Sequence, residues 1–566
     1  MTLMKSMLLG SAAAIVAVAA AQAADLPTRK AAPVEYVKIC NVGGITGWTL
    51  PGSDTCVKLS GFITAQFVGG NINTQYNYGT IANLAAVPVL PSALTTPITV
   101  GGVATTPLGV LSNDLNHTQR VLIAASTAQK NTDFYRNETG YTLRANFGFD
   151  FASNTAYGPL IGHFDLNTDM GNGLNPLQYG TNAATNITYL NEGYLTWAGI
   201  TAGKAASFYS FTGGGDNYAN IFSPDQKGFN QPVLFAYTAS FGGGFSATIA
   251  AQSPGTNGAS GGGTDQTGSY FNTNSGPNFA TFNPTSIEYG GIKWPDFVGN
   301  LHVTQSWGEA QVSGVVHDVN VASTLYNGGV NEYGCGLTST VLCNGSETKT
   351  GWGIDAGVKF ILPSVWPGFW WGPGDDFLVT GSYTQSAVWY SGLPDGMWTD
   401  NGQVNGNGQV MNLADAFFNP LTNQWSTPRA WSVAALLEHH FTPQFYVDLE
   451  ASVGGIEWSN MGGGCNLAIG LAACSVVQAL QGPMSPHATS WIVGADLGWN
   501  PVTNLNFDLE LMYQGTNQER PSGFLGTIYN YGEVNPNGTS AAYFAPGAWQ
   551  GSSDGFAGRI RITRYF

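Results

Sequence analysis

The chain has 566 residues, of which only 10% are charged and 12% are aromatic, and it carries 76 glycines and a formal net charge of −16. Soluble domains contain about 25% charged residues, and disordered chains are rich in charge and poor in aromatic residues, so the composition fits neither class. The 19 Lys and Arg residues, spread over the whole chain, also argue against a nucleic-acid partner. A large surface that faces lipid would explain the low charge and the 16 Trp and 24 Tyr residues.

Residues 1–23 have the features of a cleavable signal peptide. Lys5 provides a positive start, the stretch 7–20 is apolar but too short to span a bilayer, and residues 21–23 form a small-x-small cleavage site. We therefore expect export and a mature chain that begins near Ala24. No later run of about 18 uncharged apolar residues follows, so the sequence predicts no transmembrane helix.

Six cysteines form three pairs that are close in sequence: Cys40 with Cys56, Cys335 with Cys343, and Cys465 with Cys474. Each pair encloses a short Gly- or Asn-rich stretch, which favours disulfides that staple loops in an oxidising compartment. Free or metal-bound thiols are the alternative. A metal site would favour CxxC spacing or a neighbouring His, and neither is found here, so we expect no metal.

Alternation of apolar and polar residues indicates strands with one face toward lipid and the other toward a lumen. In 141–151 the odd positions are apolar, whereas Thr142, Arg144, Asn146 and Asp150 occupy the other face. The same alternation occurs in 57–67, 352–360, 445–451, 491–499 and 505–513. The charged face cannot meet lipid, so it must line an interior.

Short and long links alternate along the chain between these strands. Short links lie at 198–199, 242–244, 307–308, 441–443 and 501–503, and long polar loops lie at about 69–117, 153–186, 209–231, 254–284, 321–350, 390–428, 459–488 and 516–554. This pattern predicts an all-β fold, a transmembrane antiparallel β-barrel of about sixteen strands over residues 57–566, with short periplasmic turns and long extracellular loops. Sixteen strands leave a water-filled bore. Pro295 predicts a bulge within 287–307.

A secreted sandwich or solenoid is the soluble alternative, because its strands alternate and its loops are glycine-rich as well. Its apolar face would be a core of Val, Ile and Leu. Here the apolar rows contain many Phe, Trp and Tyr near strand ends, and charges lie on the opposite faces. This arrangement favours the membrane barrel.

Four segments resemble the porins of alphaproteobacteria, and the resemblance covers most of the mature chain. They are the two-cysteine entry at 35–40 and 51–61, the hairpin at 198–211, the stretch 295–301 with 307–308 and 315–319, and the chain end at 561–566. The segment 24–56 corresponds to a periplasmic entry segment. The first long loop departs from the family pattern because it is longer and more apolar.

The resemblance implies that the third loop, residues 209–231, folds into the pore. Asp216 and Asp225 would supply its negative charges and Lys227 its single cation. The opposing basic wall would contain Arg144, Lys204, Arg559 and Arg561. Such a constriction filters solutes by size and charge. A solvated lumen side chain or a structural ion pair is the alternative role for each of these residues.

The resemblance also implies a homotrimer in the lipid of the bacterial outer membrane, and a role for Phe566 in the signal that the barrel-insertion machinery reads. Phe566 shares a face with Ile560 and Ile562, and Arg564 interrupts that row. The expected function is passive diffusion of small hydrophilic solutes and ions, without a cofactor. Acidic residues, among them Asp448, Asp496 and Glu510, outnumber basic ones on the inward faces, which indicates a weak preference for cations.

Two other functions compete with this expectation. A substrate-specific channel for a sugar or peptide would use Tyr209, Phe211, Tyr218 and Phe222 as an aromatic slide. An outer-membrane hydrolase would need a Ser, a His and a carboxylate together, and no G-x-S-x-G, H-E-x-x-H or Walker motif is present. The sequence therefore does not predict an enzyme.

Overall fold

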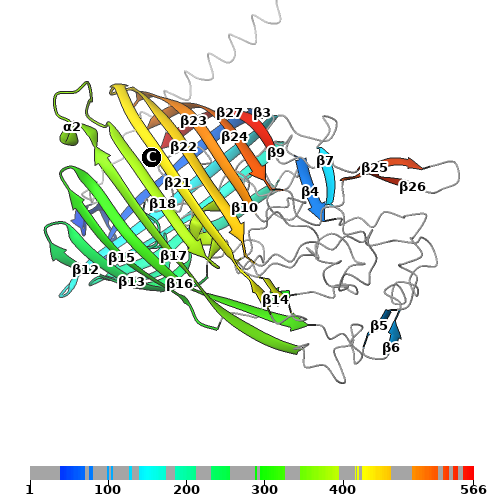
Figure 1. Cartoon of the computed structure of the whole chain (residues 1–566). Coiled ribbons are helices and arrows are strands. Elements are labelled where there is room, and N and C mark those ends of the chain that lie inside the picture. The colour runs from blue at the N-terminus through cyan, green and yellow to red at the C-terminus, as the bar shows by residue number, and fades with distance from the viewer. Residues whose placement is uncertain are drawn as a thin grey trace, which may run out of the picture.

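The structure is a computed structural model of the chain (Figure 1). It describes residues 38–70, 76–80, 98–100, 103–105, 126–130, 139–173, 185–211, 231–254, 287–289, 293–324, 344–393, 415, 417–419, 424–459, 487–519, 527–534, 540–545 and 552–566. The predicted signal peptide and the cysteines at 335, 343, 465 and 474 lie outside the described residues.

Within the described residues, sixteen strands pair in sequence order, each antiparallel to the next, into a closed ring (Figure 1). The ring consists of β3 (Cys56–Gly70), β8 (Thr139–Thr155), β9 (Gly158–Gly173), β10 (Thr185–Trp197), β11 (Ile200–Lys204), β12 (Val233–Gly242), β13 (Phe245–Gln252), β15 (Asp296–Gln305), β16 (Gly308–Thr324), β17 (Asn344–Ile361), β18 (Asp376–Gln385), β21 (Pro428–Thr442), β22 (Phe445–Trp458), β23 (His487–Val502), β24 (Leu505–Gln518) and β27 (Ser552–Tyr565). The last strand closes the ring on the first, with Arg561 opposite Gln66. The predicted antiparallel barrel of sixteen strands is confirmed.

Smaller elements lie before the first strand of the ring and in the connections between its strands. The hairpin of β1 (Ile39–Val42) and β2 (Ile45–Thr49) pairs with the start of β3, and short strand pairs lie in the long connections. These pairs are β4 (Tyr76–Thr80) with β7 (Ser126–Lys130), β5 (Ile98–Val100) with β6 (Val103–Thr105), β19 (Phe417–Asn419) with β20 (Gln424–Ser426), and β25 (Thr527–Val534) with β26 (Ser540–Ala545). The helical turns within the described residues are α2 (Leu362–Val365) and η5 (Val388–Ser391). None of the helices in the described part of the chain has the length and apolar character needed to cross a bilayer.

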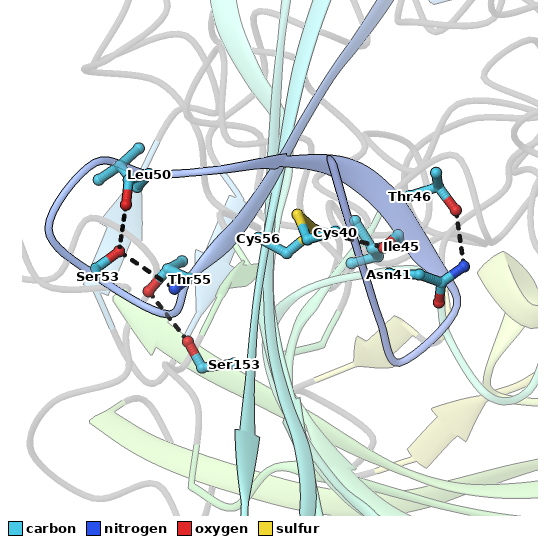
Figure 2. Close-up of a disulfide and its surroundings, with 9 residues drawn as sticks. All are labelled: Cys40, Asn41, Ile45, Thr46, Leu50, Ser53, Thr55, Cys56 and Ser153. Atoms are coloured by element: carbon cyan, nitrogen blue, oxygen red, sulfur yellow. Dashed lines mark hydrogen bonds between the residues drawn. A yellow bond between two sulfur atoms is a disulfide. The ribbon is translucent and has the colours of Figure 1, made fainter. Parts of the chain in front are cut away.

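A disulfide joins Cys40 to Cys56 and so ties β1 to the first residue of the barrel (Figure 2). Nearby, the Thr55 and Ser153 hydroxyls lie 3.1 Å apart and link this corner to β8. The expected pairing of these two cysteines is confirmed.

Side chains alternate between the two faces of the wall because successive residues of a strand point in opposite directions. On β8, Tyr141 and Leu143 point outward and are 65% and 39% exposed, whereas Thr142 points inward and is 5% exposed. The outward rows of the other strands are likewise apolar, with Phe235, Ile249 and Leu301 among the most exposed. This is the arrangement that a lipid-facing barrel requires.

Connections at one end of the ring are short and those at the other end are long. Residues 156–157, 198–199, 306–307, 443–444 and 503–504 form tight turns, and the longer link 362–375 contains α2 at the same end (Figure 1). We call these the turn end and the loop end.

Two of the predicted loop boundaries are wrong. Residues 158–173 form strand β9, which pairs along its length with β8 and β10. The predicted loop 153–186 therefore contains a tight turn at 156–157, this strand, and a connection at 174–184. The first long connection spans 71–138 rather than 69–117. The inward face of β9 carries His163, Asp165, Asn167 and Asp169, a polar set that resembles a loop in composition.

The predicted irregularity near Pro295 is present. Both β14 (Ile287–Tyr289) and β15 pair with β16, and Tyr289 faces Val321 while Phe297 faces Val316. Eight residues on one side (289 to 297) therefore span the same length as five on the other (321 to 316). The proline lies in this interruption, where its missing N–H removes no ladder bond.

Candidate functional site

The connection between β11 and β12, the third long connection of the ring, turns into the bore. Its first residues are held by side chains that point inward from the nearby strands β13 and β15. The Ser207 hydroxyl donates to Gln252 Oε1 on β13 at 2.8 Å, and Asn300 Nδ2 on β15 donates to the Phe208 carbonyl at 2.9 Å. The chain thus leaves the wall at Ala205 and crosses toward β13 and β15.

Tyr209 fixes this crossing further along the wall and is fully buried. Its carbonyl accepts a hydrogen bond from Ser313 Oγ on β16 at 2.7 Å, and its hydroxyl lies 2.7 Å from Ser382 Oγ on β18. Gln311 Nε2 donates to the next carbonyl, that of Ser210, at 3.1 Å. Two backbone carbonyls of a connecting segment are therefore satisfied inside the ring, as buried polar groups must be.

Phe211 ends the described part of this segment and packs against Leu378 and Leu436, which point inward from β18 and β21. Gly357 on β17 makes this possible because a Cβ at that position would lie 2.4 Å from Cδ1 of Phe211. The charged residues that we predicted for the constriction, Asp216, Asp225 and Lys227, lie outside the described residues.

Three of the four predicted basic residues lie close together on the inner wall, each beside a carboxylate. Arg561 Nη2 on β27 lies 3.0 Å from Asp508 Oδ2, and Arg559 contacts Glu510. Arg144 on β8 contacts Asp169 at 2.7 Å. These contacts are structural ion pairs, which was the alternative role for each residue. Strand β3 alone separates β27 from β8.

Lys204 is separate from this group. It lies on β11, and its ammonium donates to the Leu190 carbonyl at 2.6 Å. Glu192, on the neighbouring strand β10, accepts a hydrogen bond from Gln231 at the end of the third connection. Lys204 therefore lies where the third connection leaves and rejoins the wall.

Inward carboxylates form a row around part of the bore, and we call it the acidic row. Its members are direct cross-strand neighbours on β18, β21, β22, β23 and β24: Asp376, Glu438, Asp448, Asp496 and Glu510. Arg559 follows Glu510 at the same level. Neighbouring strands lie about 4.8 Å apart, and like charges directly opposite each other are destabilising. Asp376 lies 3.0 Å from Lys359 and Glu510 contacts Arg559, so this stretch of wall contains more carboxyl groups than cations.

The sequence identified Asp448, Asp496 and Glu510 as inward but did not reveal that they adjoin. It also missed Asp296, His317, Tyr390 and Asp415, which form a buried cluster at the loop end of the bore. Alternation marked His317 only as a polar position. No sequence signal joins four residues that come from two strands and a connection.

Arg564 interrupts the apolar outward row of β27, but its guanidinium has hydrogen-bond partners. Its guanidinium donates to the carbonyls of Asn504 and Tyr565, both at 2.8 Å, at the turn end of the barrel. Charge is tolerated at such a rim because a long side chain can reach polar groups.

In the described part of the chain, no group of three or more His, Cys, Asp or Glu side chains is placed to hold a metal ion. His439 and His440 point to opposite faces of β21, as adjacent residues of a strand do. Both nevertheless contact Asp375: His439 Nδ1 lies 2.7 Å from Oδ2, and the His440 backbone N–H donates to Oδ1 at 2.7 Å.

Comparisons with known proteins give a consistent family. A family model described as "Porin subfamily" matches residues 25–93 and 109–552. Porin Omp2b of Brucella suis is 26% identical over 316 residues, which cover 55% of this chain and 65% of the relative. Porin Omp2a of Brucella ovis is 44% identical over 68 residues, which cover 12% of this chain and 20% of the relative. The alignment to Omp2b thus spans slightly less than two thirds of that relative.

Solved structures are similar at low identity. The outer-membrane channel DcaP of Acinetobacter baumannii has a TM-score of 0.43 at 11% identity, and the match covers 92% of this chain and 99% of that chain. An anion-selective porin from Comamonas acidovorans has a TM-score of 0.39 at 9% identity, covering 90% and 100% of the two chains.

Proposed function

The chain belongs to the Porin subfamily, and from this premise we propose that it forms a water-filled channel for passive diffusion of small hydrophilic solutes and ions. Its place is the bacterial outer membrane, which it spans as a β-barrel. Family membership indicates a channel rather than an enzyme. We extend this to the absence of any hydrolytic activity, which an assay on ester and lipid substrates would test.

One observation carries the proposal: the third connection enters a closed ring of sixteen strands and is anchored to the opposite wall through Tyr209 and Phe211. A barrel of this size leaves an aqueous bore unless something fills it. An inward segment held by buried hydrogen bonds narrows the bore without blocking it. This arrangement supports filtration by size.

The wall charges support filtration by charge as well. We propose that Asp216, Asp225 and Lys227 of the third connection face Arg144, Lys204, Arg559 and Arg561 across the constriction. The wall arginines are paired with Asp169, Asp508 and Glu510, so they contribute less net positive charge than the sequence suggests. The acidic row then favours cations over anions.

Planar-bilayer recording of the purified protein tests the channel most directly. We expect stepwise, ohmic conductance in KCl and a reversal potential in a KCl gradient that shows a weak preference for cations. Swelling of liposomes with uncharged sugars of increasing size should give a plain size limit. Absence of conductance from folded protein contradicts the channel, and a preference for anions contradicts the charge filter alone.

A substrate-specific channel is the competing function. The aromatic side chains of Tyr209 and Phe211 lie in the bore, but both are buried in packing against the wall, which favours an anchoring role over a slide for sugars. Saturable block of conductance by one sugar or peptide class would support the specific channel instead.

The proposal also covers the processing and assembly of the chain. We propose removal of residues 1–23, a periplasmic entry segment at 24–56, a barrel over 57–566 and a homotrimer in outer-membrane lipid. Cys335 with Cys343 and Cys465 with Cys474 are proposed as loop disulfides. Mass spectrometry of the mature, non-reduced protein tests the cleavage and the disulfides, and migration on gels before and after heating tests the trimer.

A further inference from the structure

The connection between β18 and β21 also enters the bore. It begins with Ser386 and Ala387 and forms the turn η5, and these residues are buried together with Tyr390 and Ser391. Two inward side chains hold its backbone. Ser382 Oγ on β18 lies 2.9 Å from the Tyr390 carbonyl, and Ser432 Oγ on β21 donates to the Ser391 carbonyl at 2.6 Å. The turn therefore lies on the inner face of the wall.

Tyr390 joins this turn to strands β13 and β15 of the wall. Gln252 Nε2 on β13 donates to its hydroxyl at 2.8 Å, and the hydroxyl donates to Asp296 Oδ2 on β15. Its ring meets the ring of Tyr209 edge to face, with centroids 5.0 Å apart. Tyr209 belongs to the third connection, so two inward segments contact each other through two fully buried tyrosines.

A second set of contacts, between the His317 ring and two carboxylates, holds the same turn in place. The His317 ring on β16 lies between two carboxylates: Nδ1 is 2.9 Å from Asp296 Oδ1, and Nε2 is 3.4 Å from Asp415 Oδ2. The other oxygen of Asp415 accepts the backbone N–H of Val388 at 2.5 Å. All three charged side chains are almost completely buried.

Because Asp296, His317 and Asp415 are buried, their contacts hold the connection in its position. Removing one member of a buried ion pair leaves a charge without compensation, which is strongly destabilising. Asp415 and Val388 both belong to the connection, whereas Asp296 and His317 belong to the wall. The connection cannot leave the wall unless Asp415 separates from His317.

We infer that residues 386–393 of the β18–β21 connection form a second constriction element of the channel, held against the wall by Asp296, His317 and Asp415 and braced against the third connection through Tyr390. The inference rests on the proposed channel function. Tyr390 bonds the last residue of β13 and the first of β15, at the loop end, whereas Phe211 packs nearer the turn end. A solute that enters from the loop end meets the second element first.

Three variants of the full-length protein test this inference by single-channel conductance and by exclusion of uncharged polyethylene glycols. The double variant His317→Gln/Asp415→Asn removes the charges at similar size, and Tyr390→Phe removes only the hydroxyl. His302→Gln is the matched control, because His302 contacts Glu309 at 3.2 Å on the same hairpin and has no described contact with the connection. We expect conductance to rise roughly 1.5-fold or more in the double variant, less in Tyr390→Phe and not in the control.

A second measurement locates the connection independently of conductance. Leu393 is buried at the end of the described turn. In the parent chain, Leu393→Cys should resist a membrane-impermeant maleimide. In the double variant, the same cysteine should react with it. Folding is checked by heat-dependent migration, and if the double variant does not fold, Tyr390→Phe decides the outcome.

Unchanged conductance and size limit in both folded variants would overturn the inference, as would equal labelling of Leu393→Cys in all backgrounds. Failure of the channel itself gives a different result. In that case the folded parent conducts no current, while Leu393→Cys still gains reactivity in the double variant.

Discussion

Gly61 and Phe566 exchange two backbone hydrogen bonds, at 3.0 and 3.3 Å, that extend the pairing of β27 with β3 to the last residue of the chain. A Cβ on Gly61 would lie 2.7 Å from Cζ of Phe566 and 2.3 Å from the carbonyl oxygen of Asn146. The seam of the barrel therefore depends on the absence of a side chain at one position of the first strand.

We expect Gly61→Val to destabilise the closed ring. The added side chain meets backbone, which cannot rotate away, and overpacking of this kind costs about 1–3 kcal/mol or more. Gly299→Val is the matched control, because a Cβ there meets only the Thr248 carbonyl oxygen at 3.9 Å. The temperature at which heat-dependent gel migration changes should fall for Gly61→Val alone. Equal transition temperatures for both variants would contradict the steric argument.

Phe566 provides the second prediction. If the chain end is read during insertion, Phe566→Ala should lower the fraction of folded protein in the outer membrane several-fold. Phe556→Ala is the control, because Phe556 lies outward at the other end of the same strand and is 47% exposed, close to the 52% of Phe566. Equal loss in both variants would indicate a general effect of lost apolar surface. Quantitative blotting of membrane fractions measures the difference.

The acidic row leads to a prediction about selectivity. Asp448→Asn/Asp496→Asn removes two adjacent carboxylates and should shift the reversal potential in a KCl gradient toward anion preference. The interaction between two charges 4 Å apart in water is about 1 kcal/mol, which sets the scale at roughly a fivefold change in permeability ratio.

Arg559→Gln removes a cation at the same level of the bore and should shift the potential in the opposite direction. A shift of the same sign in both variants would mean that overall shape, and not the row, controls selectivity.

The Cys40–Cys56 disulfide should stabilise the entry to the barrel. It encloses a separation of 16 residues, for which chain entropy gives about 3 kcal/mol. Cys40→Ser/Cys56→Ser should therefore unfold at lower denaturant than the oxidised parent. A reductant should shift the parent toward the variant. Identical midpoints for the oxidised parent and the variant would show that the β1–β2 hairpin does not limit unfolding.

Asp375 makes part of the stability depend on pH. Burial raises the pKa of its carboxyl, but the backbone N–H groups of His440 and Gly372 and the His439 side chain together lower it below its usual value. A lowered folded-state pKa stabilises the protein above the unfolded pKa of about 3.9, and that contribution disappears as the pH falls through the folded-state value.

We therefore expect the unfolding temperature of the parent to decrease below about pH 4. Asp375→Asn should show a smaller decrease, because it has no carboxyl to protonate at this site. Parallel pH profiles for the parent and the variant would contradict this assignment. Thermal unfolding followed by circular dichroism between pH 2 and pH 7 measures both.

The error at 153–186 shows where sequence patterns mislead in this type of fold. In a soluble protein a segment such as 158–173, with two Asn, two Asp and four Gly, indicates a loop. In a strand that faces a lumen, the polar residues of this segment lie on the inner, hydrated face, while Leu160, Phe164 and Leu166 lie on the outer face. Composition is therefore a weaker guide than alternation when both faces are exposed to a solvent.

Alternation, together with the aromatic outer rows and the short and long links, indicated a barrel with a charged inner face from the sequence alone, because the side-chain period of a strand is local and does not depend on its partners. It placed Arg144, Asp448, Glu510 and Arg559 on the inner face, and the resemblance indicated that the third connection turns inward.

Only the tertiary structure decided which of these residues meet. Closing the ring sets the register of every strand against its neighbours, and register converts separate inward acids into the acidic row and predicted wall cations into ion pairs. It likewise brings His317 and Tyr390 together from segments 73 positions apart (317 to 390), a contact that no local pattern encodes.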